Sequence, residues 1–191
     1  MVTHSRSMCH HNSCRTEYNT TCLPIISSNW YVRSIFSQDI PAICSWVHNR
    51  RLLQLVSSDD ADFLTESILS DWLDHAVDIV IIADILTGEP VGFCTLSSTE
   101  VEDSPPGFVE ICHLIVNPRF RYLFIGPRIC KAAKKLAKRL GFQELFGRVV
   151  PQHRFGLLLA KREKFIELSS PPSHLPLGFK WFRYPLTAMT T

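Results

Sequence analysis

The sequence predicts an α/β fold of the α+β kind, in which a mixed, mostly antiparallel sheet of six to seven strands is flanked by about four helices. Apolar runs of strand length occur along the chain together with segments of helical periodicity. Three consecutive strands in the middle argue against a simple doubly wound parallel sheet and favour a mixed sheet with helices on both faces. The 191 residues, 46% of them apolar, suffice for one core.

Residues 1–28 are polar and show neither the helical nor the strand period, so a disordered leader is expected before a single domain over residues 29–188. The cysteines and histidines of this leader form no compact zinc-binding pair, and no metal site is predicted. The seven cysteines, an odd number at scattered spacings, indicate a reducing compartment. Because no apolar run is long enough to span a bilayer, we expect a cytoplasmic protein without a membrane partner.

The first half of the domain is expected to begin with a strand at residues 30–35, followed by two helices. Asp39 is predicted to cap the first helix, with a proline just inside it, and the second helix is expected over about residues 62–73. Residues 78–83 and 91–96 form two apolar strands, and the Thr-Gly-Glu turn between them predicts a hairpin.

The second half is organised around residues 108–142, which combine a strand, an Arg-rich loop and a basic helix. The helix is expected to begin at Pro127, with apolar residues at every third or fourth position until Gly141 ends it. A strand that feeds a helix N-terminus through a tight loop commonly binds a phosphate group. A further strand, helix and terminal strand follow at about residues 145–150, 153–165 and 177–186.

Charge is unevenly distributed, although the net charge is only +2. No acidic residue occurs between Ile111 and Gln143, whereas residues 59–89 are mostly acidic where they are charged. The chain has either a positive region that steers an anion to the basic helix, or two solvated helix faces of opposite sign. The near-neutral total and the lack of aromatic residues among the lysines of that helix argue against nucleic acid as a partner.

The strand, loop and helix resemble the central motif of the GNAT superfamily of N-acetyltransferases, where a strand precedes Arg/Gln-x-x-Gly-x-Gly/Ala and a helix. Here the strand ends in Leu-Ile-Val, an Asn-Pro step stops it, and Arg121 and Gly126 stand at the family's spacing. Residues 89–93 and 150–165 resemble the family's second hairpin strand and its last helix. The resemblance covers about residues 30–168.

This resemblance implies a GNAT-like sheet with a splay between its fourth and fifth strands, where the pantetheine arm of acetyl-CoA lies beside the central strand. Main-chain groups of residues 112–116 are then the expected contacts for the arm. Loop N–H groups and the helix N-terminus are expected to hold the pyrophosphate. The predicted cofactor-binding residues are Leu114, Ile115, Val116, Arg121, Tyr122, Leu123, Phe124, Ile125 and Gly126.

Two residues of the central strand are the predicted catalytic groups. The resemblance implies that a main-chain N–H near Leu114 polarises the thioester carbonyl, and that Glu110 has the position of a general base in some members. The alternative for Glu110 is a glutamate near a strand start that simply faces solvent. His113, on the same strand, is expected to be a structural residue.

Three departures from the family's pattern bear on activity. Phe124 and Tyr122 stand where the motif often has glycine, so a side chain at Phe124 narrows the phosphate cradle unless the backbone dihedrals turn it away. On the last helix, His153 replaces the usual Asn, and Ala160 has the position of the Tyr that protonates the leaving thiolate, so no general acid is predicted. Lys164 in place of Gly predicts a differently built helix end.

The predicted function is an acyl-CoA-dependent N-acyltransferase that transfers acetyl from acetyl-CoA to a primary amine by direct attack in a ternary complex. A small-molecule or peptide amine is the expected acceptor, and the enzyme is expected to be a monomer or homodimer. The alternative is a catalytically silent GNAT-like module that binds CoA or another protein, which the residues Phe124 and Ala160 favour.

Overall fold

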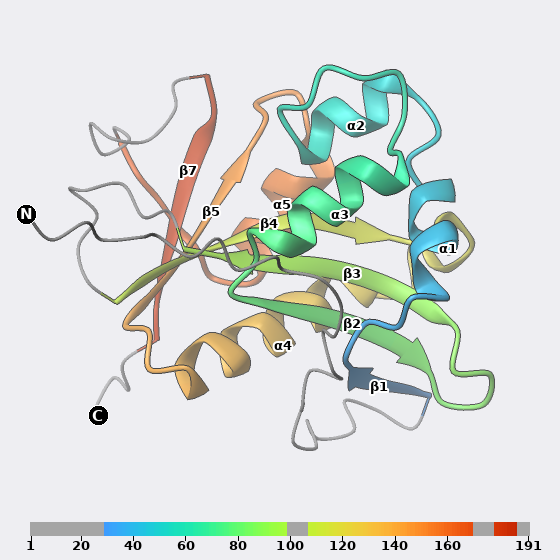
Figure 1. Ribbon diagram of the computed structural model, residues 1–191. Helices are drawn as coiled ribbons and strands as arrows, with labels where there is room; N and C mark the ends of the chain where they lie inside the picture. The colour runs from blue at the N-terminus through green and yellow to red at the C-terminus, as the bar shows by residue number, and fades with distance from the viewer. Residues whose placement is uncertain (1–28, 99–106, 170–177, 187–191) are drawn as a thin grey trace, which may run out of the picture.

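The molecule is seen in a computed structural model that describes residues 29–98, 107–169 and 178–186. The predicted leader and most of the loop before Gly107 lie outside these residues. In the described part, seven strands form one mixed sheet in the order β1-β2-β3-β4-β5-β7-β6, with five α-helices around it (Figure 1). The mixed sheet and its flanking helices confirm the predicted fold class.

The elements agree with the sequence in kind and differ mainly at their ends. The strands are β1 (Trp30–Arg33), β2 (Asp78–Asp84), β3 (Pro90–Ser97), β4 (Phe108–Val116), β5 (Glu144–Val149), β6 (Ile166–Glu167) and β7 (Lys180–Pro185). The helices are α1 (Asp39–Ser45), α2 (Arg50–Val56), α3 (Glu66–Asp74), α4 (Ile125–Arg139) and α5 (Arg154–Arg162), with a 3₁₀ turn at Pro118–Phe120. The predicted hairpin is confirmed, because β2 and β3 pair antiparallel.

The helices begin at positions that the apolar pattern does not reveal. The additional helix α2 occupies a short apolar piece, and it begins where the Asn49 side chain accepts a hydrogen bond from the N–H of Leu52 at 2.9 Å. Helix α3 starts later than predicted because Thr65 caps it, accepting from the N–H of Ile68. Helix α4 starts two residues before Pro127, directly after the loop.

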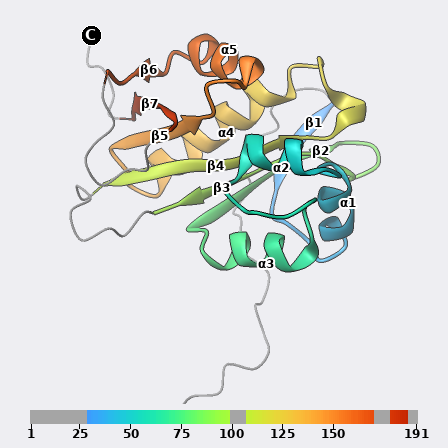
Figure 2. The same ribbon diagram turned by 90° about the horizontal axis from the view of Figure 1, so that it is seen from above.

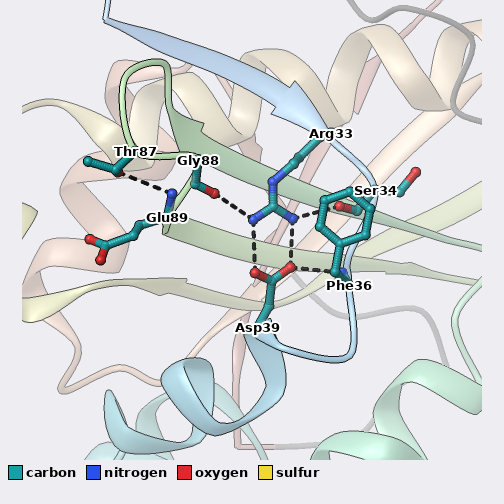
Figure 3. A network of polar contacts seen from close by, with 7 residues as sticks. All are labelled: Arg33, Ser34, Phe36, Asp39, Thr87, Gly88 and Glu89. Carbon is teal, nitrogen blue, oxygen red and sulfur yellow. Dashed lines mark hydrogen bonds and ion pairs between the residues drawn. The ribbon is translucent and has the colours of Figure 1, made fainter.

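Asp39 is not the N-cap of α1, which is a correction to the sequence prediction. It is the first residue of the helix, and its carboxylate turns back to the guanidinium of Arg33, at 2.6 and 2.8 Å, and to the N–H of Phe36 (Figure 3). Arg33 also donates to the carbonyl of Gly88 in the β2–β3 turn. A bidentate pair that is almost fully buried thus fastens β1, α1 and the hairpin to one another.

The two faces of the sheet carry different helices. Apolar residues of α4 pack with alternate residues of β2, β3 and β4, such as Val80, Cys94 and Val109. Helices α1, α2 and α3 cover the other face, where they pack against sheet residues such as Ile81 and Phe93. Figure 2 shows α3 and α4 on opposite sides of the sheet. No helix in the described segments is both long enough and apolar enough to cross a membrane.

Helix α4 lies unusually close to the sheet at Gly92. A Cβ atom at this position would lie 2.7 Å from Cδ1 of Ile129 and 2.8 Å from Cγ2 of Ile125. Such contacts are shorter than packed side chains tolerate, so a side chain at position 92 would require Ile125 and Ile129 to move away from β3. The position of that first turn, which begins directly after the Arg-rich loop, is therefore set by β3.

Candidate active site

Strands β4 and β5 pair only over the first part of their length. They are parallel and in register from Phe108 opposite Glu144 to Ile111 opposite Gly147, and no registered pair follows among the residues that the structure describes. On its other edge, β4 continues to pair with β3 as far as Val116. The main chain of residues 112–116 therefore faces an opening toward β5, where an extended ligand can hydrogen-bond as an additional strand.

A β-bulge interrupts β4 at this opening. Cys112 pairs with Thr95 and Ile115 with Phe93, so two residues, His113 and Leu114, lie opposite the single residue between them on β3. His113 has a left-handed φ of 51°. Bulges of this kind leave the extra residue unpaired and redirect side chains. The bulge therefore places Leu114, the predicted main-chain contact for the thioester, at the level of the opening.

The loop after β4 keeps a glycine-like backbone without glycine. Tyr122 has φ 71° and Phe124 has φ 59°, both in the left-handed region. Tyr122 and Phe124 are 84% and 57% exposed, and the Phe124 ring lies against the guanidinium of Arg162 on α5, 4.6 Å from the ring centroid. A non-glycine residue in this conformation costs about 1 kcal/mol. The loop thus holds a backbone conformation that glycine usually provides, at an energetic cost.

The N-terminus of α4 is free of competing acids. Phe124 is its N-cap residue and makes no side-chain capping hydrogen bond, and the first turn holds no acidic residue. The leading N–H groups of a helix lack intrahelical acceptors and carry a partial positive charge, so they suit an anion. Ile125 is fully buried against β3 and can contribute only its main chain, whereas Arg121 and Leu123 are exposed.

Glu110 is buried instead of facing solvent. Only 2% of its side chain is accessible, and its Oε1 atom lies 3.2 Å from Nε of Arg148 on β5. Oε1 has no hydrogen-bond partner, so the contact is an ion pair without good hydrogen-bond geometry. Burial raises the pKa of Glu110, and the positive charge of Arg148 opposes this rise. A carboxylate whose pKa is raised in this way is a stronger base than an exposed glutamate.

A cavity of about 290 Å³ adjoins the opening on the face that carries α3. Its lining includes His113 and Arg148 from the sheet and Trp72 from α3. The His113 ring stacks on Trp72 with centroids 3.8 Å apart, and its Nδ1 lies 2.9 Å from Oγ1 of Thr95. Burial, with a smaller contribution from Arg148, lowers the pKa of His113 to about 3, so the imidazole is neutral at physiological pH.

A larger hollow of about 560 Å³ lies elsewhere, between α1, the β2–β3 turn and residues 117–119. No residue of β5 or α4 lines it, and its buried carboxylate, Asp39, is already held by Arg33. The hollow therefore does not combine with the opening between the two strands. The smaller cavity is the one next to the predicted chemistry.

Helix α5 ends in the conformation that glycine usually provides, contrary to the sequence prediction. Lys164 has φ 60°, and the N–H of Phe165 donates to the carbonyl of Ala160 as in a Schellman cap. Ala160 is buried on α5. On α4, Lys134 is mostly buried and pairs with Glu163, so it is not part of the solvated basic face.

Sequence reasoning missed three residues of this site. Arg148 is not among the predicted site residues, although a single Arg in an otherwise apolar strand is a usable signal. Trp72 and Asp59 are not among them either, and nothing in the sequence brings these two residues to β4. His113 was expected to be structural; its stacking and hydrogen bond agree with that, but it also lines the cavity.

Known structures share this fold. A phosphinothricin acetyltransferase of the GNAT superfamily from Sinorhizobium meliloti, in complex with acetyl-CoA, has a TM-score of 0.65 at 15% identity, over 82% of this chain and 88% of that one. Aminoglycoside acetyltransferase AAC(6')-Ib, in complex with coenzyme A, has a TM-score of 0.63 at 16% identity, over 82% and 94%.

A third similar structure is larger. N-acetylglutamate synthase from Neisseria gonorrhoeae, complexed with coenzyme A and N-acetylglutamate, has a TM-score of 0.63 at 18% identity, over 85% of this chain and 36% of that one. These identities show a shared fold. No curated protein sequence matches the chain.

The family is shown by the sequence itself. A model of the acetyltransferase (GNAT) family, whose members use acetyl-CoA as cosubstrate, matches residues 44–155, more than half of the chain. The matched range includes β4 with its opening toward β5, the left-handed loop and α4. The chain therefore belongs to the acetyltransferase (GNAT) family.

Proposed function

We propose that the protein is an N-acetyltransferase that moves the acetyl group of acetyl-CoA to a primary amine by direct attack in a ternary complex. The amine nitrogen forms a bond to the acetyl carbon, the carbon–sulfur bond breaks, and CoA leaves. The observation that carries the proposal is the end of β4–β5 pairing at Ile111 and Gly147, next to a cavity with a buried carboxyl group behind it.

Binding of the cosubstrate is supported by main-chain geometry. Residues 112–116 offer backbone groups to the amide-containing pantetheine arm, and the N–H near Leu114 is assigned to the thioester carbonyl. Residues 121–126 and the N-terminus of α4 are assigned to the pyrophosphate. The left-handed backbone at Tyr122 and Phe124 is the conformation that glycine would give to this loop.

Glu110 is assigned as the general base. The amine reaches the site as an ammonium ion and must lose a proton before it can attack. Glu110 does not line the cavity itself, but its ion-pair partner Arg148 does, so the proton would have to reach Glu110 through a relay such as a water molecule. The raised pKa of Glu110 makes it a stronger base than an exposed glutamate.

Cys112 is unsuited to carry the acetyl group in a two-step reaction. Cys112 is buried on β4, and burial raises the pKa of its thiol well above the ordinary value. The thiolate, not the thiol, is the reactive form of cysteine. Direct attack by the amine is therefore favoured over a covalent acetyl-enzyme.

The first test is calorimetry with acetyl-CoA and CoA. Binding at micromolar concentrations is expected, and no heat at millimolar concentrations would refute the proposal. The second test is thiol release with a panel of primary amines. Glu110→Gln is expected to lower kcat/KM about 100-fold or more. Glu144→Gln removes a carboxylate from β5 at the paired end of the two strands and should change activity little.

The catalytically silent module remains a distinct second candidate, favoured by the buried Ala160 at the position of a general acid. It predicts that CoA binds but that no amine in the panel releases the thiol. Turnover with any amine excludes it. If the acetylation rate does not change with pH above the pKa of the CoA thiol, the thiolate leaves without being protonated by the enzyme.

A further inference from the structure

We propose that the acceptor carries a second cationic group, and that Asp59 and Asp71 bind this group at the rim of the cavity beside the opening in the sheet. The proposal rests on the proposed function, because it specifies which primary amines that site accepts. It follows from the position, charge and existing contacts of the groups that line the cavity.

The cavity has a sheet wall and a helix wall. His113 and Arg148 stand on the sheet wall, next to the point where β4 and β5 stop pairing. Asp59 and Asp71 stand on the opposite wall, on the loop after α2 and on α3. The cavity of about 290 Å³ corresponds to roughly ten water volumes of about 30 Å³ each. It therefore suits a small acceptor that can contact residues of both walls.

Asp59 has no cationic partner among the described residues. Its Oδ2 accepts hydrogen bonds from Nε1 of Trp72, at 2.9 Å, and from the hydroxyl of Ser57. The nearby acids Asp60 and Asp62, which do not line the cavity, are instead paired with Arg50. Two neutral donors orient the Asp59 carboxylate but leave its negative charge uncompensated.

Asp71 is also available to a cation. Its ion-pair partner in the described part of the chain is His75, whose Nδ1 lies 3.5 Å away and carries charge only when the ring is protonated. The cavity's helix wall therefore presents two carboxylates and no permanent cation. A ligand group beside them is stabilised when it is positive, and a ligand carboxylate there is repelled.

The sheet wall favours an uncharged amine. The guanidinium of Arg148 and the neutral ring of His113 offer an ammonium ion no compensating charge, and the carboxylate of Glu110 behind them is already engaged by Arg148. An amine at this wall therefore loses its proton more readily and becomes a nucleophile. A diamine satisfies both walls, with one nitrogen neutral at the opening and the other charged at the rim.

Three probe acceptors of equal chain length separate the possibilities: 1,4-diaminobutane, 1-aminobutane and 4-aminobutanoate. They share a primary amine and differ only at the far end, which is positive, neutral or negative. We expect kcat/KM for the diamine to exceed that of the monoamine by about tenfold, as for one favourable charge contact. The amino acid is expected to be the poorest acceptor. A monoamine or amino acid that equals the diamine overturns the proposal.

The variants test which residues carry the preference. Asp59→Asn keeps an oxygen that can accept from Trp72, and Asp71→Asn changes an exposed side chain, so both are expected to fold. Each should reduce the preference for the diamine over the monoamine by about threefold, and the pair should abolish it. Asp62→Asn removes the same charge outside the cavity and should leave the preference unchanged.

Calorimetry on the CoA-saturated protein distinguishes failure of this proposal from failure of the proposed function. If no amine is acetylated but the diamine still binds about tenfold more tightly than the monoamine, the function fails and the site for a second cation stands. If amines are acetylated without a preference that depends on Asp59 and Asp71, the function stands and this proposal is wrong. Equal or absent binding of diamine and monoamine also overturns it.

Discussion

At the scale of single residues, the protein places ordinary side chains in backbone conformations that favour glycine. His113, Tyr122, Phe124 and Lys164 all have a φ between 51° and 71°. Each costs the fold about 1 kcal/mol relative to glycine, and persists because neighbouring contacts determine the backbone. Three of the four lie on the bulge or in the loop of the candidate site, where such strain is commonly found.

The fourth, Lys164, allows a clean measurement of this cost. Lys164→Gly is expected to raise the free energy of unfolding by about 1 kcal/mol, because glycine adopts the left-handed cap without strain. Lys161→Gly, three residues earlier inside α5, should lower it by about 1 kcal/mol. Urea denaturation measures both. Equal signs for the two substitutions would contradict the assignment of Lys164 as a left-handed cap.

His113 predicts a pH dependence of stability. Its pKa is lowered to about 3 in the folded protein, so the unfolded chain binds the proton more readily between about pH 3 and 6.5. The contribution of His113 to stability is therefore complete above pH 6.5 and falls by up to about 1.4 kcal/mol per pH unit on acidification below it. Urea denaturation from pH 7 to pH 5 measures the free energy of unfolding of the natural protein and of His113→Gln. The two values should converge as the pH falls, and a constant difference between them would contradict this prediction.

At the scale of elements, the fit of α4 against β3 decides where the loop and the helix N-terminus lie. Gly92→Ala is expected to destabilise the fold by about 1–3 kcal/mol, because its Cβ would meet Ile125 and Ile129. The same displacement of α4 should also weaken binding of CoA. Thermal unfolding and calorimetry measure the two effects.

Gly126→Ala is the matched control in the first turn of α4. A Cβ there meets Leu159 at 3.4 Å, an ordinary contact, and alanine is favoured over glycine inside a helix by about 0.5–1 kcal/mol. This variant should be as stable as the natural protein or more stable, yet bind CoA less tightly if the phosphate approaches this backbone. An unchanged affinity would remove Gly126 from the predicted cofactor-binding residues.

At the scale of the whole molecule, charge is separated along the chain. No acidic residue occurs from Ile111 to Gln143, while acidic residues of the α2–α3 loop and α3 line the smaller cavity. The basic helix and these acidic residues also lie on opposite faces, because α3 and α4 cover different sides of the sheet (Figure 2). The polyanionic cosubstrate and the cationic acceptor that we propose would therefore each be attracted to a different side of the molecule.

This separation predicts that two ligands differing in their phosphates depend on salt to different extents. The affinity for CoA should fall several-fold between about 0.05 and 0.5 M NaCl, because salt screens attraction of its phosphates to α4 and the loop. Pantetheine, which lacks these phosphates, should bind more weakly and show little salt dependence. Calorimetry at both concentrations tests this, and the same dependence for the two ligands would contradict it.

Much of the fold could be predicted because it depends on local periodicity and on turns. The hairpin of β2 and β3, the amphipathic helix α4 and its Gly141 end were all expected from residues close together in the sequence. Helix α2 and the start of α3 were not predicted. Asn49 and Thr65 cap these helices and decide where they begin, and the apolar pattern carries no signal for a cap. The order of strands required the resemblance to a known family.

By itself, the sequence determined the fold class and the strand–loop–helix between residues 108 and 142, because the local signals for these are contiguous in the chain. Only the tertiary structure decided that Phe124 adopts a left-handed backbone, that Glu110 is buried against Arg148, and that Asp59 and Asp71 line the same cavity as Arg148. These relations join residues from separate elements, and packing of α3 and β5 against β4, not any local pattern, brings them together.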